Sequence, residues 1–147
     1  MKAIQTAVPE DIPQLCELLE TLFQQESDFQ PDIEKQSDGL RQIIERPEVG
    51  AILVLRDESS IIGMVNILYS ISTACGGLVG LVEDMIVQPE KRNQGAGSAL
   101  LREAIKFAQA KGCLRITLLA DRTNTSAVRF YQRHGFTLSE LRGRRSK

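Results

Sequence analysis

The chain has 147 residues, enough for one domain with a sizeable core, and its 42% hydrophobic and 25% charged residues are ordinary globular values. No run approaches the ~18 apolar residues that span a bilayer, and residues 1–6 lack the apolar core of a signal peptide. We therefore expect a single cytoplasmic domain over residues 1–147, without a membrane partner.

The net charge is −1, but the charges are sorted along the chain. Residues 1–50 hold eleven acidic and four basic side chains, whereas residues 91–147 hold three acidic and thirteen basic ones. This division indicates two partners of opposite charge, such as a polyanionic cofactor and a cationic substrate, although a solvated charged face is the alternative. The basic residues 142–147 are typical of a solubilising tail, so we expect no nucleic-acid partner.

Cysteine and histidine offer little chemistry here. Cys16, Cys75 and Cys113 have no paired metal-ligand spacing, and His134 is the one histidine of the sequence. We expect no bound metal and no catalytic cysteine.

Taken in chain order, the apolar patterns predict ten elements. A first strand covers residues 2–6, and two helices follow, one starting near Pro9 and broken at Pro31, the other ending before Pro47. Three strands come next, at residues 51–55, 61–70 and 78–87, the first two antiparallel. A long helix over residues 98–111, a strand over 114–120, a short helix after residue 124 and a strand over 136–142 complete the chain. This order predicts an α+β fold: a central mixed sheet, antiparallel early, with a parallel crossover around the long helix and helices on both faces.

A glycine-rich turn precedes the long helix, with the sequence Arg92-Asn93-Gln94-Gly95-Ala96-Gly97 followed by Ser98. Such a turn between a strand and a helix aims unpaired N–H groups and the positive end of the helix dipole at one point, where a pyrophosphate can bind. Gly95 and Gly97 lack a Cβ, which allows positive φ and close phosphate approach. The spacing excludes a P-loop and a dinucleotide fingerprint. A tight connection without a ligand is the alternative reading.

A second motif begins at Asn124, a good N-cap, and continues through Ala127, Phe130 and Tyr131 to Gly135-Phe136. The two motifs, in this order and separated by a helix and a strand, resemble the acetyl-CoA-binding signatures of the GCN5-related N-acetyltransferases (GNAT). They cover roughly the last third of the chain.

The resemblance implies that acetyl-CoA is the cofactor. Its pyrophosphate would lie on residues 92–98, and the pantetheine would pair with the backbone of Met85, Ile86 and Val87, because the strand 82–87 would splay from the strand 114–120. Asn124, Ala127 and Tyr131 would also contact the coenzyme. By resemblance, the N–H near Met85 would stabilise the thioester oxygen.

Two carboxylates, Glu83 and Asp84, interrupt an otherwise apolar strand, and an unpaired buried carboxylate is expensive. Alternation places Glu83 on the face of Leu81 and Met85, and Asp84 on the opposite face. Glu83 resembles the general base of several amine acetyltransferases, and Tyr131 the tyrosine that protonates the leaving thiolate. A paired structural carboxylate and a core tyrosine are the respective alternatives.

We therefore predict direct acetyl transfer to a primary amine. The expected acceptor is a small, positively charged molecule. The acceptor wall, by resemblance, would come from residues 20–40, with Phe23, Glu26, Asp28, Phe29 and Glu83 binding the substrate. The alternatives are an acetyltransferase acting on protein N-termini or lysines, and a non-catalytic acyl-CoA-binding module. One terminal strand stands where the family usually has two, and an uncovered sheet edge favours pairing with a second copy, so a homodimer is expected.

Overall fold

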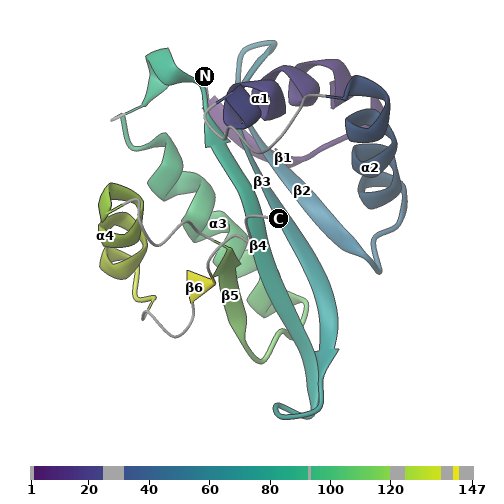
Figure 1. Cartoon of the computed structure of the whole chain (residues 1–147), viewed down its shortest axis with the longest axis vertical. Helices are drawn as coiled ribbons and strands as arrows, with labels where there is room; N and C mark the ends of the chain where they lie inside the picture. Colours follow the sequence, from purple (N-terminus) through teal and green to yellow (C-terminus); the bar gives the residue numbers. More distant parts are fainter. Residues whose placement is uncertain (1, 25–31, 93, 120–124, 137–140, 143–147) are drawn as a thin grey trace.

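Figure 1 shows the computed structural model, which describes residues 2–24, 32–92, 94–119, 125–136 and 141–142. The elements follow in the order β1 (Lys2–Thr6), η1 (Pro9–Asp11), α1 (Ile12–Gln24), α2 (Ile33–Glu45), β2 (Gly50–Asp57), β3 (Ser60–Ser72), β4 (Gly77–Val87), η2 (Pro89–Lys91), α3 (Ala96–Ala110), β5 (Ile116–Leu119), α4 (Thr125–Arg133) and β6 (Leu141–Arg142). The predicted order of helices and strands is confirmed.

The described strands form one sheet in the order β1-β2-β3-β4-β5-β6. Neighbours from β1 to β4 are antiparallel, and β4 pairs with β5 in parallel, with α3 as the crossover between them. The predicted mixed sheet and its parallel crossover are thereby confirmed. A second parallel pair, between β5 and β6, follows the α4 crossover and was not anticipated from the sequence.

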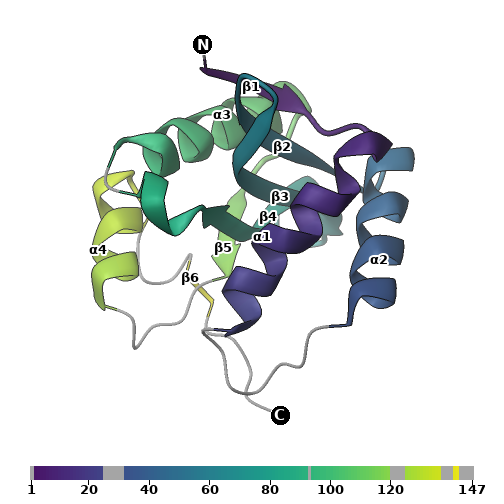
Figure 2. The same ribbon diagram turned by 90° about the horizontal axis from the view of Figure 1, so that it is seen from above.

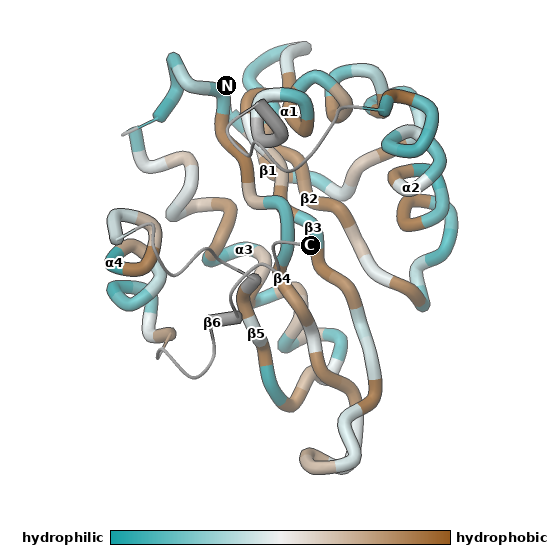
Figure 3. The backbone as a smooth tube through the Cα atoms, in the orientation of Figure 1, coloured by the Kyte–Doolittle hydropathy of each residue, from teal (hydrophilic) through white to brown (hydrophobic). Residues whose placement is uncertain are grey.

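The helices form two layers, with α1 and α2 on one face of the sheet and α3 and α4 on the other (Figure 2). Each layer has its own buried core, because alternate residues of β2 and β3 point to opposite faces. Val54 and Met64 pack under α1 and α2, whereas Leu53 and Val65 pack under α3. Figure 3 shows hydrophobic stretches along the central strands and a mixture of hydrophilic and hydrophobic residues along the helices.

The α1 layer is fixed to the sheet by a buried ion pair. The carboxylate of Asp11 accepts a hydrogen bond from the backbone N–H of Val8 at 3.0 Å and lies 2.8 Å from Nη2 of Arg56 on β2. Gln14 on α1 accepts from the backbone N–H of Ile61 at 2.8 Å. These contacts hold the start of α1 over β2 and β3.

Among the described residues, no helix is both long and apolar enough to cross a bilayer.

Candidate active site

The pairing of β3 with β4 contains an irregularity at Glu83, the predicted base, and at its neighbour Asp84. Met64 pairs with Ile86 and Asn66 pairs with Glu83, so two steps along β3 correspond to three along β4. Asp84 has a φ of 55°, in the left-handed region that non-glycine residues rarely adopt. This combination is a β-bulge, which bends the strand and redirects the side chains beyond it.

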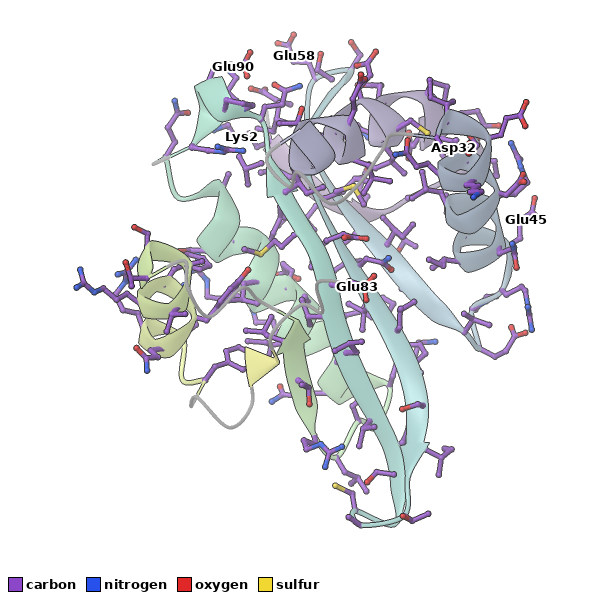
Figure 4. All side chains as sticks on the ribbon, viewed as in Figure 1. Lys2, Asp32, Glu45, Glu58, Glu83 and Glu90 are labelled. Carbon is purple, nitrogen blue, oxygen red and sulfur yellow. The ribbon has the colours of Figure 1, made fainter. Side chains whose placement is uncertain are left out.

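The bulge corrects one expectation from strict alternation. Met85 packs with the core beneath α3, whereas Glu83 stands opposite Asn66 on the face covered by α1 and α2. Glu83 and Met85 therefore lie on opposite faces of the sheet, because one extra residue at the bulge reverses the alternation. Figure 4 labels Glu83 near the middle of β4.

The parallel pairing of β4 with β5 is short. It covers Gly80, Leu81 and Val82, which pair with Ile116, Thr117 and Leu118. Within the described residues, the ladder has no further pair, so Met85, Ile86 and Val87 have no β5 partner there. Met85, Ile86 and Val87 were predicted to offer their backbone to the coenzyme. They lie beyond the end of the β4–β5 ladder, although the side chain of Ile86 is buried in the α1 layer.

The turn after β4 differs from the expectation in the position of its glycines. The helix α3 begins at Ala96, so Gly97 and Ser98 lie inside its first turn, and only Gly95 adopts a positive φ, 83°. No atom outside its immediate chain neighbours lies within 4 Å of a Cβ built on Gly95. Among the described residues no side chain caps the helix, so the amides of its first turn point outward without intrahelical acceptors. This arrangement fits an anionic group such as a pyrophosphate.

Side chains of the same turn hold its shape. Arg92 donates from Nε to the carbonyl oxygen of Val87 at 3.1 Å, and Gln88 donates from Nε2 to the carbonyl oxygen of Ile61 at 3.2 Å. Gln94 donates to the carbonyl oxygen of Glu90 at 3.5 Å. Asn93 lies outside the described residues.

The second motif packs on the first. A Cβ on Gly97 would lie 3.5 Å from Cζ of Phe130 on α4 and 3.9 Å from Cε of Met85. The absence of a side chain at Gly97 therefore lets α4 approach α3 closely; its predicted role as a positive-φ turn residue was wrong. Tyr131 is half-buried against the α3 core and makes an edge-on ring contact with Phe130, with centroids 5.4 Å apart. Ala127 is half-buried on the same helix, and Asn124 lies outside the described residues.

A hydrogen bond connects the two motifs. Oγ of Ser98 lies 3.1 Å from Nε2 of His134, whose ring also contacts that of Phe130 at a tilt of 57°, with the centroids 4.8 Å apart. Burial lowers the pKa of His134 below its ordinary value of 6.5, and the positive charges of Arg102 and Arg133 lower it further. The neutral imidazole is therefore favoured beside the first turn of α3.

The proposed acceptor wall is only partly described. Phe23 belongs to the last turn of α1, while Glu26, Asp28 and Phe29 lie outside the described residues. Sequence reasoning missed Asn66, the cross-strand partner of Glu83, which is 4% exposed. The available signal was an amide inside the apolar run of residues 61–67.

The two helix layers differ in charge. The helices α1 and α2 carry five acidic and two basic side chains, whereas α3 and α4 carry four basic and one acidic. The division seen along the sequence thus becomes a division across the sheet. The glycine-rich turn lies at the basic layer, and Glu83 lies on the face of the acidic layer.

Comparison with known proteins assigns this architecture to a class. The model of the acetyltransferase (GNAT) family matches residues 12–136, and the chain belongs to this family. Among solved structures, a transcriptional regulator from Bacillus halodurans shares the fold with a TM-score of 0.84 at 24% identity, covering 95% of each chain. An aminoglycoside N-acetyltransferase in complex with CoA shares it with a TM-score of 0.79 at 16% identity, covering 93% of this chain and 88% of that one.

Two curated relatives are N-acetyltransferases by name. The aminoalkylphosphonate N-acetyltransferase of Salmonella typhimurium is 27% identical over 139 residues, which is 95% of this chain and 87% of that protein. The glucosamine 6-phosphate N-acetyltransferase of Trypanosoma brucei brucei is 30% identical over 81 residues, or 54% of this chain, and the match spans about half of that protein, 53%. The predicted family, an acetyltransferase that uses acetyl-CoA, is confirmed.

Proposed function

We propose that this protein transfers the acetyl group of acetyl-CoA directly to the primary amine of a small, positively charged molecule. The observation that carries the proposal is the arrangement around β4. Among the described residues the β4–β5 ladder ends at Val82, and the bulge at Asp84 directs Glu83 to the opposite face from Met85. The family membership sets the reaction class, and this geometry separates a coenzyme side from an acceptor side.

The coenzyme side lies at the basic layer. The amides at the start of α3, opened by Gly95, suit the pyrophosphate, and the backbone of Met85, which has no β5 partner among the described residues, suits the amide groups of the pantetheine. Ile86 and Val87 remain predicted contacts to the same arm. The N–H near Met85 is the proposed donor to the thioester oxygen. Asn124 and Ala127 remain predicted contacts to the same coenzyme.

Glu83 and Tyr131 are the proposed proton carriers. Bound acetyl-CoA supplies an activated thioester carbonyl. Glu83 accepts the proton that the acceptor ammonium loses, directly or through water, and Tyr131 donates a proton to the departing sulfur. The two residues lie on different elements, β4 and α4, which belong to opposite sides of the proposed reaction centre.

The charge of the acceptor is inferred from the acidic layer. A cationic amine gains favourable field energy on the side of α1 and α2, and the relatives named above act on small amino compounds according to their names. Phe23, Glu26, Asp28 and Phe29 stay proposed acceptor contacts. A homodimer and a cytoplasmic location also stay part of the proposal.

A thiol-release assay tests the proposed function. Acetyl-CoA is incubated with the protein and separately with polyamines, amino acids, aminoglycosides, amino-sugar phosphates, aminoalkylphosphonates and peptides. We expect turnover with a small primary amine. Turnover restricted to peptides would favour the protein-acetylating alternative, and coenzyme binding without turnover would favour a binding module.

A further inference from the structure

The side chain of Asn66 has an unsatisfied oxygen in the interior. The residue is 4% exposed, and its Oδ1 has no hydrogen-bond partner in the described part of the protein. Buried amide oxygens are nearly always hydrogen-bonded, because an orphaned acceptor loses its water without compensation. An unpaired oxygen at this position therefore points to a partner that binds from outside the chain.

The residues around Asn66 limit the kind of chemical group that can bind its side-chain oxygen. Asn66 lies between Ile52 on β2 and Glu83 on β4, on the face covered by α1 and α2. Ile52 and Met64, its neighbours on that face, are 1% and 0% exposed and have no polar side-chain atom. Directly opposite residues of neighbouring antiparallel strands have Cβ atoms about 5 Å apart, so one small ligand group reaches both Asn66 and Glu83.

Other buried side-chain atoms without a hydrogen-bond partner lie elsewhere in the described part of the protein. The hydroxyl of Tyr69 also lacks a partner, but Tyr69 packs with the core beneath α3, on the other face of the sheet. Burial raises the pKa of Tyr69, so that hydroxyl stays neutral. Gln36 also has unpartnered side-chain atoms, but it lies on α2 and has no register position on the sheet. Among the described residues, Asn66 is therefore the orphan acceptor that pairs in register with the proposed base.

Resting on the proposed function, we propose that Asn66 binds the acceptor nitrogen and selects primary amines over secondary amines. Oδ1 accepts one N–H of the substrate while Glu83 faces the same nitrogen. Both protein groups accept hydrogen bonds when Glu83 is ionised, and an amine nitrogen with two N–H bonds can donate to both at once. A hydroxyl has a single donor and satisfies only one of them.

The number of N–H bonds on the attacking nitrogen explains why primary amines are preferred over secondary amines. A primary ammonium loses one proton through Glu83 and attacks with two N–H bonds, one on Oδ1 and one toward the base. The new C–N bond forms as the C–S bond breaks, and the sulfur gains a proton from Tyr131. Glu83 has by then released the first proton to water and takes the second proton from the nitrogen, which leaves an amide with one N–H. That second proton returns through water to the Tyr131 phenolate, so one proton is released to solvent in each turnover. A secondary amine attacks with a single N–H bond, which the base removes, so Oδ1 loses its partner. Asn66 itself exchanges no proton.

The test replaces Asn66 with leucine, which has a similar shape without polar atoms. The best primary amine of the thiol-release screen and its N-methyl derivative are compared as substrates for both proteins. We expect the wild-type preference in kcat/KM for the primary amine to fall about 10- to 100-fold in Asn66→Leu, as loss of a hydrogen bond to a charged group predicts. The KM of the primary amine should rise, and acetyl-CoA affinity should stay unchanged.

Stability separates this role from a structural one. Because Oδ1 has no partner among the residues that the structure describes, Asn66→Leu should unfold at the same or a higher temperature than the wild type. Ser70→Ala is the matched control, since Ser70 lies on the same face of β3 at an exposed position and should leave both preference and stability unchanged. If Asn66→Leu fails to fold, Asn66→Val is measured in the same way.

An unchanged preference in a folded Asn66 variant, while the wild type acetylates primary amines, would overturn the inference and leave the proposed function intact. A lower unfolding temperature in both variants with an unchanged KM would assign Asn66 a structural role and overturn it equally. Absence of turnover by the wild type with every amine would reject the proposed function and, with it, an acceptor site at Asn66.

Discussion

The hydroxyl oxygen of Ser98 lies 3.1 Å from Nε2 of His134, so the first turn of α3 is hydrogen-bonded to the residue that follows α4. Ser98 and His134 are 36 residues apart in the sequence, one at the glycine-rich turn and the other in the second motif. Phe130 also packs beside Gly97, so the two predicted coenzyme motifs are in direct contact in the fold.

The lowered pKa of His134 predicts a pH dependence of stability. Since the folded pKa lies below the unfolded value of 6.5, the unfolded chain binds more protons in the window between them. Stability is therefore retained above about pH 6.5 and lost as pH falls toward the folded pKa. Thermal unfolding from about pH 7.5 to about pH 5 should show a smaller decrease in His134→Gln than in the wild type. Equal decreases would show that His134 does not contribute.

The two glycines of the turn should respond differently to alanine. Gly95→Ala places a Cβ on a residue with φ of 83° and should lower the free energy of unfolding by about 1–2 kcal/mol. The same substitution should weaken the binding of acetyl-CoA. Gly97→Ala makes an ordinary contact with Phe130 inside a helix and should be neutral or stabilising. Chemical denaturation and calorimetry measure both effects. Gly95→Asn is the control, because asparagine tolerates the left-handed conformation.

Tyr131→Phe should lower kcat while leaving acetyl-CoA affinity nearly unchanged. The variant keeps the ring that packs on Phe130 and removes only the proposed proton donor. Steady-state kinetics and coenzyme titration measure the two quantities separately. Wild-type turnover across the pH range would identify Tyr131 as a core residue only.

Glu83→Gln should reduce kcat/KM for the amine about 100-fold near neutral pH, because the acceptor loses its base. The deficit should shrink as pH rises, since solvent then supplies the unprotonated amine. Asp84→Asn is the matched control: it alters the adjacent carboxylate and retains a residue type that tolerates positive φ. Equal losses in both variants would argue for a general charge effect instead of a base at Glu83.

The homodimer prediction concerns the sheet edges, which in the described sheet are β1 and β6. Edge strands present unpaired N–H and C=O groups, and pairing with a second copy covers them. Light scattering at micromolar concentration should give twice the 16.3 kDa of one chain. Deletion after Gly135 should weaken the dimer. A monomer mass would reject the dimer, and a dimer unaffected by the deletion would reject the role of the C-terminal strand.

Local patterns determined much of this protein. The period of apolar residues predicted the helices and strands, and the glycine-rich turn predicted an open helix N-terminus, because these features depend on residues near one another in sequence. The two motifs also predicted the family, which the match over residues 12–136 confirms.

Only the tertiary structure decided the faces of the site. The bulge at Asp84 separates Glu83 from Met85, and it arises from the register of β4 against β3, which alternation along one strand cannot reveal. Likewise, Gly97 meets Phe130 and Asn66 meets Glu83 across distant segments. A residue's neighbours in space depend on strand pairing and helix packing, so those contacts had to come from the folded chain.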